Sequence, residues 1–310
     1  MKQLLLMFPG QGSQAVGMGC DLCAAEPVMR ETFAEASEVL GYDLEQRCAA
    51  GPAALLARTD ITQPALLCVS IGILRILRRD GLRFAVALGH SLGEYSALVA
   101  TGAVSFVDAL RIVLRRGEAM QAAAAASEGG MAAVVGLDDA AVDGLCAEMD
   151  DLWPANFNSP GQVVVSGTKA ALLELEARAK SAGARRVIPL PVSGAFHSPL
   201  MEPARLPLQV ELEKAEWRVP DPLFYSVCSL RLETDGFVEL LQRQLVSPVR
   251  FTQAVKALYA AGYDVFLEVG PGSVLGGLAR RIVPEAVVSR VSDAETLSAL
   301  RNDRRFLEAL

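Results

Sequence analysis

The sequence is short of positive charge and of long hydrophobic runs, and both shortages exclude classes of protein. Its 310 residues include 29 Lys or Arg and 36 Asp or Glu, which gives a formal net charge of −7. Because nucleic-acid-binding domains usually carry a basic surface, we expect no nucleic-acid partner. The apolar run from Ala65 to Leu77 is too short to span a bilayer and contains Arg75, so we expect no membrane span.

The first residues lack the pattern of a secretory leader. The apolar run Leu4–Phe8 is short, and Pro9-Gly10 ends it in the way that a turn ends a buried strand. We therefore expect a cytoplasmic protein. Hydrophobic residues make up 52% of the chain, which is enough apolar material for a large core in one or two domains.

Cysteine is too sparse and too scattered for a disulfide framework, so we expect free thiols. The chain has six cysteines, and only Cys20 and Cys23 lie close together in sequence. That spacing is also found in redox and zinc sites, but no second close pair and no histidine accompanies it. We predict a helix start with incidental cysteines, and no metal site.

One stretch has the pattern of a nucleophile elbow. Phe84–Leu88 is a short apolar run typical of a buried strand, and Leu92–Ala100 has the composition of a helix. Between them, Gly89-x-Ser91-x-Gly93 has the spacing at which a sharp turn exposes a serine oxygen near the positive end of a helix dipole. The alternative is an ordinary serine in a glycine-rich loop. The flanking strand and helix favour a nucleophile.

Histidine is scarce, and this narrows the choice of a base for Ser91. The chain has only His90 and His197. Adjacent side chains on a sharp turn diverge, so His197 is the better candidate, and it lies in a loop just before a helix.

The turn Pro9–Gln14 follows the first strand and lies at the edge of the sheet where ligands bind in open α/β folds. It lacks the glycine spacing and the lysine of nucleotide-binding loops.

The middle of the chain predicts a separate small unit. Small residues and Gly129-Gly130 suggest a boundary, after which the pattern is strand, helix, strand, strand, helix, strand up to Leu190. This order is ferredoxin-like. We predict a ferredoxin-like small subdomain at 127–191, inserted into a discontinuous large α/β subdomain at 1–126 and 192–310.

A long helix over 105–125 precedes that boundary. Ser105 is a candidate N-cap, with Asp108 in the first turn. Arg115 and Arg116 point about 100° apart on this helix, so one of the two arginines can face inward.

Several stretches match the motifs of one enzyme family in order along the chain. They are 8–14 (FPGQGSQ), 62–65 (TQPA), 89–94 (GHSLGE), 116–117 (RG), 156–162 (NFNSPGQ), 194–198 (GAFHS) and 268–272 (EVGPG). In these stretches the chain resembles malonyl-CoA:acyl carrier protein transacylases and the related acyltransferases of polyketide synthases. The resemblance implies a hydrolase-like large subdomain with a parallel sheet.

The resemblance also implies roles for particular residues. Ser91 is then the nucleophile that takes the acyl group, and His197 is the base that takes and returns its proton. Backbone amides of Gln11 and Leu92 form the oxyanion hole. Arg116 pairs with the free carboxylate of the malonyl group, in a two-pronged geometry that lysine lacks.

Two further positions depend on the same resemblance. In this family a backbone carbonyl orients the histidine, and the stretch Ser247–Arg250 assigns that carbonyl to Arg250. Phe196 stands where methylmalonyl-selective relatives tend to have serine, so it implies a preference for malonyl units.

The expected reaction is therefore ping-pong transfer of malonyl from malonyl-CoA to the phosphopantetheine thiol of an acyl carrier protein. It requires no metal and no bound organic cofactor. Two alternatives stay open: a serine hydrolase that clears acyl groups from carrier proteins, and a non-catalytic subunit that docks on them. Arg116 argues against the hydrolase, and the presence of both Ser91 and His197 argues against the non-catalytic subunit. Whether the pathway makes fatty acids or polyketides stays open.

Overall fold

The structure, a computed structural model, describes residues 3–303. The strands are β1 (Leu4–Phe8), β2 (Val86–Gly89), β3 (Gly129–Val135), β4 (Leu152–Ser159), β5 (Gln162–Thr168), β6 (Arg186–Pro189), β7 (Leu223–Phe224), β8 (Val265–Val269) and β9 (Val287–Val291). The helices are α1 (Cys20–Ala25), α2 (Pro27–Leu40), α3 (Leu44–Ala50), α4 (Ala53–Leu56), α5 (Thr59–Arg79), α6 (Gly93–Ala100), α7 (Phe106–Ala125), α8 (Asp139–Ala147), α9 (Lys169–Ser181), the 3₁₀ helix η1 (Pro199–Ala204), α10 (Arg205–Leu212), α11 (Phe237–Leu245), α12 (Phe251–Ala260), α13 (Val274–Ile282) and α14 (Ala294–Asn302).

The main sheet is parallel throughout, with the order β7-β2-β1-β8-β9. Strand β2 pairs with one edge of β1, and β8, which comes much later in the chain, pairs with the other edge. The carboxyl end of β1 is therefore the point at which the strand order reverses, where open α/β sheets bind their ligands.

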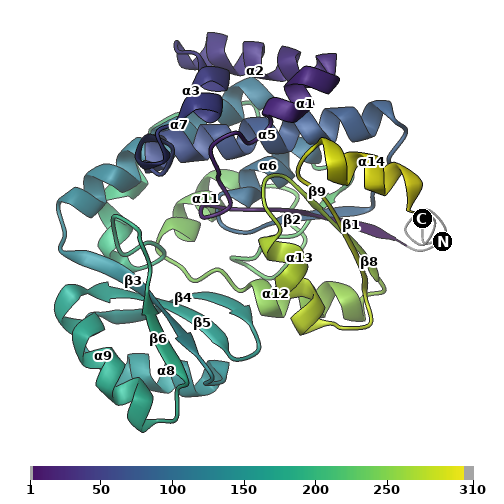
Figure 1. Cartoon of the computed structure of the whole chain (residues 1–310). Helices are drawn as coiled ribbons and strands as arrows, with labels where there is room; N and C mark the ends of the chain where they lie inside the picture. The colour runs from purple at the N-terminus through teal and green to yellow at the C-terminus, as the bar shows by residue number, and fades with distance from the viewer. Residues whose placement is uncertain (1–2, 304–310) are drawn as a thin grey trace.

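Both faces of this sheet are covered, which explains why β1 is apolar at every position. Leu4, Leu6 and Phe8 belong to the core under the large helical layer, whereas Leu5 and Met7 belong to the core on the opposite face. Figure 1 shows α2, α5 and α7 on one side of the sheet and α12 and α13 on the other. A continuous apolar strand is what a doubly covered parallel sheet requires.

A second sheet is antiparallel, with the order β4-β5-β3-β6, and it lies beside the main sheet with α8 and α9 on one face (Figure 1). Its elements follow the chain order strand, helix, strand, strand, helix, strand between residues 129 and 189. The predicted fold class, a parallel α/β part with an inserted ferredoxin-like part, is confirmed. The exact boundaries of the small subdomain, 127–191, stay a prediction.

The small sheet is joined to the large part by backbone hydrogen bonds. The Phe157 N–H donates to the Val249 carbonyl at 2.9 Å, and the Val249 N–H donates to the Ala155 carbonyl at 2.8 Å. In addition, the Thr252 hydroxyl donates to the Phe157 carbonyl at 3.1 Å. The loop between α11 and α12 thus extends β4 by one bridge and fixes the two parts against each other.

Individual elements agree closely with the sequence pattern. Helix α7 begins after Ser105, whose hydroxyl accepts from the Asp108 N–H at 3.0 Å, as expected for an N-cap. All six cysteines are free thiols, and Cys20 begins helix α1. Among the described helices, α5 alone has the length and hydropathy of a membrane span, and 89% of that window is buried inside the protein.

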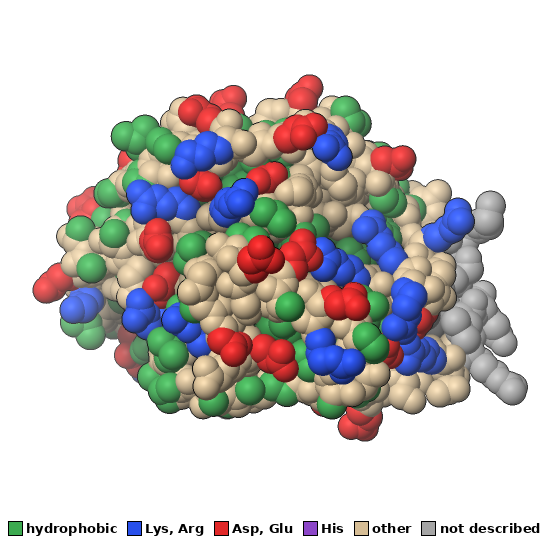
Figure 2. Space-filling model, turned by 90° about the horizontal axis from the view of Figure 1, so that it is seen from above, with side chains coloured by type: hydrophobic (Ala, Val, Ile, Leu, Met, Phe, Trp, Pro, Cys, Tyr) green, Lys and Arg blue, Asp and Glu red, His purple; other side chains and the backbone are tan. Residues whose placement is uncertain are grey.

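The outer face of the α2 layer has no region of a single charge. In Figure 2, which looks down on this face, Lys and Arg side chains are interspersed with Asp and Glu. Near α2, Arg75 pairs with Glu35 at 2.7 Å and Arg79 with Glu26 at 2.8 Å. Partly exposed pairs of this kind contribute little to stability.

Candidate active site

Ser91 lies on a sharp turn between β2 and α6. Its φ is 52°, in the left-handed region that non-glycine residues rarely adopt. A Cβ on Gly89 would lie 1.8 Å from the Gly93 carbonyl carbon, and one on Gly93 would lie 2.0 Å from the Phe8 carbonyl oxygen. Both positions therefore require glycine. The turn has the backbone geometry of a nucleophile elbow, and its strain is held by the strand and helix on either side.

His197 meets Ser91 in the structure, although 106 positions separate them in the sequence. The Ser91 Oγ and the His197 Nε2 are 2.7 Å apart. His197 also has a left-handed backbone, with a φ of 59°, and the hydroxyl of Ser166 on β5 donates to the carbonyl of the preceding residue, Phe196. The small sheet thus helps to hold the loop that presents the imidazole.

Two backbone carbonyls determine the tautomer of His197. Its Nδ1 is 2.9 Å from the Gln244 carbonyl oxygen and 3.2 Å from the Ser247 carbonyl oxygen. Since carbonyls only accept, Nδ1 carries the hydrogen and Nε2 offers a lone pair. The Ser91 hydroxyl therefore donates to Nε2, the arrangement that a general base needs.

The expectation that the Arg250 carbonyl orients His197 is wrong. Arg250 is the N-cap of α12, and its carbonyl accepts the first helical hydrogen bond, from the Ala254 N–H at 3.0 Å. Gln244 lies instead in the last turn of α11, where carbonyls have no intrahelical partner. The Gln244 carbonyl at the end of α11 is therefore available to His197, whereas the Arg250 carbonyl at the start of α12 is already occupied within its own helix.

Arg116 reaches the same point from α7, and its neighbour Arg115 faces solvent. The Arg116 side chain is 1% exposed. Its Nη1 donates to the Gln63 Oε1 at 3.0 Å, and its Nη2 donates to the Gln244 Oε1 at 3.0 Å and to the Ser91 Oγ at 3.2 Å.

All of these partners of Arg116 are neutral, and its Nε has no partner among residues 3–303. A buried guanidinium without a carboxylate is costly unless a ligand supplies the negative charge. Burial lowers the pKa of Arg116, and the nearby Tyr95 and Glu94 oppose that shift.

Burial also keeps His197 neutral. It lowers the pKa of His197 to about 3, and the positive charge of Arg116 adds to the shift, while the hydrogen bond to the Gln244 carbonyl opposes it. The free imidazole therefore stays unprotonated at ordinary pH.

These side chains line one cavity of about 310 Å³. Ser91, His197 and Arg116 face it, as do the predicted residues Gln11, Leu92 and Phe196. The amides of Gln11 and Leu92 donate no hydrogen bond to another described residue. Phe196 is 6% exposed and lies next to His197 in the wall of the cavity. Of the predicted site residues, only Arg250 does not line it.

Comparison with known proteins agrees with this geometry. A family model described as an acyl transferase domain matches residues 5–310. A malonyl CoA-acyl carrier protein transacylase of Salmonella typhimurium is 45% identical over 305 residues, which cover 96% of this chain and 99% of the relative. One from Bacillus subtilis is 42% identical over 303 residues, which cover 96% of each chain.

The chain belongs to the malonyl-CoA:acyl carrier protein transacylase family.

Solved structures of this transacylase family have the same fold. An acyl carrier protein S-malonyltransferase from Vibrio cholerae is 44% identical, with a TM-score of 0.93 over 96% of this chain and 100% of that one. A malonyl-transacylase solved in complex with a type II PKS acyl-carrier protein is 42% identical, with a TM-score of 0.94 over 97% of this chain and 100% of that one. The resemblance drawn from the motifs is confirmed.

Gln244 is the residue of the transacylase site that sequence reasoning missed. Its side-chain amide donates to the Ser91 carbonyl at 3.0 Å and to a carboxylate oxygen of Glu94, and its side-chain oxygen accepts from Arg116. The Gln244 side chain therefore contacts both the elbow and Arg116, and its backbone carbonyl accepts from His197. The sequence holds one signal for it: Gln244 is a polar residue within the apolar stripe of Phe237, Leu240, Leu241 and Leu245.

Glu94 and His90 flank the elbow and are held by other parts of the chain. Glu94 is fully buried and accepts from the Val227 N–H at 2.8 Å as well as from Gln244. Burial raises the pKa of Glu94, against these hydrogen bonds. The His90 Nε2 is 2.9 Å from the Asn158 Oδ1, so this second histidine points to the small sheet and away from Ser91.

Proposed function

We propose that Ser91, His197 and Arg116 carry out the reaction of this family, transfer of a malonyl group from CoA to the phosphopantetheine thiol of an acyl carrier protein. The observation that carries the proposal is the fully buried Arg116, which lies 3.2 Å from the Ser91 Oγ and has only neutral partners. An acyl group that ends in a carboxylate would neutralise it.

In the first half-reaction, the Ser91 Oγ forms a bond to the thioester carbon while its proton moves to the His197 Nε2. The amides of Leu92 and Gln11 stabilise the oxyanion of the tetrahedral intermediate. The bond between carbon and sulfur then breaks, and the imidazolium returns the proton to the departing CoA thiolate. The product is a malonyl ester on Ser91.

The second half-reaction runs the same steps in reverse. His197 removes the proton of the phosphopantetheine thiol, the thiolate attacks the ester, and the Ser91 oxygen leaves and regains the proton. The carbonyls of Gln244 and Ser247 stabilise the imidazolium in both halves because they accept from Nδ1. No step draws on a metal or on a bound organic cofactor. A cytoplasmic location is part of the same proposal.

A serine hydrolase that removes acyl groups from carrier proteins is the alternative. It would use the same Ser91 and His197, with water in place of the thiol. The relatives at 40–45% identity over nearly the whole chain are transacylases, which favours transfer over hydrolysis.

Labelled malonyl-CoA tests the proposal and separates the two reactions. We expect one malonyl group on the peptide that contains Ser91, seen by intact mass and peptide mapping, and rapid discharge when the phosphopantetheine form of a carrier protein is added. The Ser91→Ala variant should carry no adduct. A full adduct on that variant would remove Ser91 as the nucleophile. Equal discharge with and without the phosphopantetheine form would indicate a hydrolase.

A further inference from the structure

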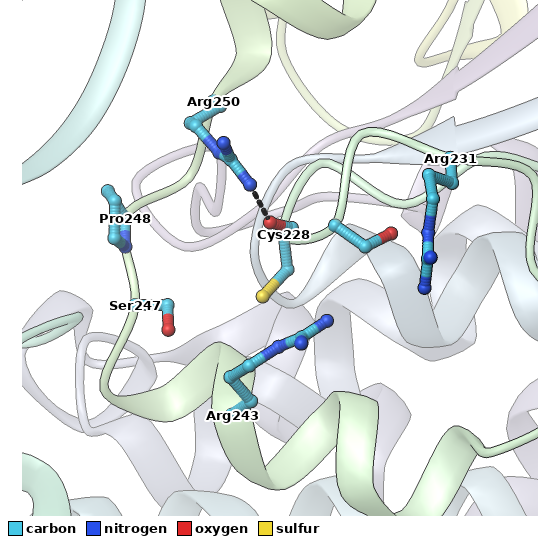
Figure 3. Close-up of a pocket in the computed structure, with 7 residues that line it drawn as sticks. Cys228, Arg231, Arg243, Ser247, Pro248 and Arg250 are labelled. Atoms are coloured by element: carbon cyan, nitrogen blue, oxygen red, sulfur yellow. Dashed lines mark hydrogen bonds between the residues drawn. The ribbon is translucent and has the colours of Figure 1, made fainter.

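A second cavity, of about 500 Å³, lies outside the Ser91 site and shares no lining residue with it. Three arginines line it: Arg231, Arg243 and Arg250. They come from three separate segments, namely the loop before α11, helix α11 itself and the start of α12. Figure 3 shows the three side chains on different sides of Cys228.

The cavity has positive charge that is not neutralised. Cys228, Ser229, Ser247 and Pro248 complete its wall, so no acidic side chain lines it among the described residues. Arg231 has an ion pair with Glu233 at 3.3 Å, and its side chain is 71% exposed. Neither Arg243 nor Arg250 has a carboxylate partner within residues 3–303.

The loop that contains Cys228 is held by several hydrogen bonds and has a buried serine hydroxyl without a partner among the described residues. The Ser226 N–H donates to the Arg231 carbonyl at 3.0 Å, and the Leu230 N–H donates to the Ser226 carbonyl at 3.0 Å, so the loop is tightly closed. An Arg250 Nη2 donates to the Cys228 carbonyl and ties this loop to α12 (Figure 3). The Ser229 Oγ is buried and has no hydrogen-bond partner in the described part of the chain.

We propose that this cavity binds the phosphate or diphosphate group of a small molecule. Guanidinium groups offer paired donors that match the oxygens of phosphate, and three of them suit a group with two or more negative charges. A single carboxylate would leave most of these donors unused. The volume lies in the range of small-molecule sites, so there is room for the remainder of a phosphate ester.

The position of the site connects it to the catalytic histidine. The Ser247 side chain lines the cavity, while the Ser247 carbonyl accepts from the His197 Nδ1 at 3.2 Å. Arg243 immediately precedes Gln244, whose carbonyl accepts from the same nitrogen at 2.9 Å. A phosphate group in the cavity would therefore lie against the segment that orients the base of the reaction.

Titration of the whole protein with inorganic diphosphate, followed by calorimetry at low ionic strength, tests the site without relying on the acyl-transfer reaction. We expect saturable binding that weakens as salt is added, because exposed charges are screened. The double variant Arg243→Gln, Arg250→Gln should bind diphosphate about 10-fold or more weakly, since each lost charge-assisted hydrogen bond is worth roughly that factor.

Two controls decide where the diphosphate binds. Arg218→Gln removes an exposed arginine elsewhere and should leave binding unchanged. Arg116→Gln removes the arginine of the Ser91 site and should also leave it unchanged. Binding that is lost in Arg116→Gln and kept in the double variant would overturn the proposal, as would the absence of binding to the native protein. Arg243→Glu serves if the double variant does not fold because, unlike Arg250, the Arg243 side chain donates to no backbone carbonyl within residues 3–303.

Kinetics then separate two sources of the phosphate group. If the cavity receives a phosphate of CoA itself, the double variant should raise KM for malonyl-CoA about 10-fold and leave KM for malonyl-pantetheine, which lacks those phosphates, unchanged. If it receives a separate phosphate ester, both KM values should stay the same while diphosphate binding is lost. Unchanged diphosphate binding in the double variant contradicts the site in either case.

Discussion

Two cavities of this molecule use arginine in opposite ways, although both adjoin the segment from Arg243 to Ser247. In the Ser91 cavity a single arginine is buried and touches amides and a hydroxyl. The Cys228 cavity is lined by three arginines: Arg231 and Arg243 are exposed, Arg250 is half-buried, and Arg231 pairs with a carboxylate. Burial removes solvent screening, so one buried charge can select a substrate, whereas charges open to solvent mainly attract an anion.

The same contrast holds for the groups around each cavity. At Ser91, the Gln244 side chain that accepts from Arg116 is itself held by hydrogen bonds to Glu94 and to the elbow backbone. At Cys228, Arg250 donates to one backbone carbonyl and Arg231 pairs with the carboxylate of Glu233. The first site is therefore expected to be sensitive to single substitutions, and the second to ionic strength.

The largest expected effect is the loss of the base. His197→Ala should reduce malonyl transfer by roughly 10²–10⁴-fold, the range for lost general acid–base catalysis. His90→Ala is the matched control, because it removes a buried imidazole that contacts Asn158 and not Ser91. The measurement is kcat/KM for transfer to carrier protein. If His90→Ala proves the more damaging change in a folded protein, the base is assigned to the wrong histidine.

The next largest effect concerns acyl selectivity. Arg116→Ala should lower malonyl transfer by about 10²–10³-fold, as expected when one partner of a buried charge pair is lost. Acetyl transfer should stay equal or rise, because the unpaired charge is gone. Arg115→Ala, the solvent-facing neighbour on the same helix, is the matched control and should change neither rate. An unchanged ratio of kcat/KM for malonyl-CoA and acetyl-CoA in Arg116→Ala would show that this arginine does not hold the carboxylate.

A smaller effect should follow from the wall of the Ser91 cavity. Phe196 is expected to crowd the carbon between the two malonyl carbonyls, so a methyl branch there should cost ~1–3 kcal/mol in the native protein. Phe196→Ser should admit methylmalonyl-CoA and leave the contact to Arg116 intact. The check is the ratio of kcat/KM for malonyl-CoA and methylmalonyl-CoA in both proteins. Equal ratios would place the selectivity elsewhere.

The smallest effect is on stability as a function of pH. The pKa of His197 is about 3 in the folded protein, whereas an unperturbed histidine has a pKa of 6.5. Between these pH values the unfolded chain therefore binds one proton more than the folded protein. The free energy of unfolding should therefore fall as the pH drops from about 6.5 towards 3. Urea unfolding at several pH values should show a shallower dependence in His197→Gln. An identical dependence in both proteins would mean that folding does not lower the pKa of His197.

Much of the fold could be predicted because it depends on local patterns. Strand β1 lies where the apolar run Leu4–Phe8 predicts it, and α7 begins at its predicted cap, since apolar runs and capping chemistry act over a few residues. The elbow was equally visible from the spacing of its two glycines, one required by a contact within the turn and the other by the adjacent strand β1. The inserted sheet followed from the order of its elements.

The error at Arg250 and the omission of Gln244 have one physical cause. Whether a carbonyl can accept from a distant histidine depends on where helices end, and sequence patterns place helix ends poorly. The pattern around Ser247–Arg250 was at the right place in the chain, but the carbonyls that reach His197 belong to Gln244, at the end of α11, and to Ser247.

The sequence by itself determined that this chain is an α/β protein with a serine elbow, one distant histidine and an arginine able to face inward. Only the tertiary structure decided which atoms meet. It brings His197 to Ser91 from 106 positions away, buries Arg116 among neutral partners, and collects three arginines from separate segments around Cys228. Local patterns arise from short-range backbone and side-chain preferences. Contacts between distant segments depend on how the whole core packs, and no short window of sequence contains that information.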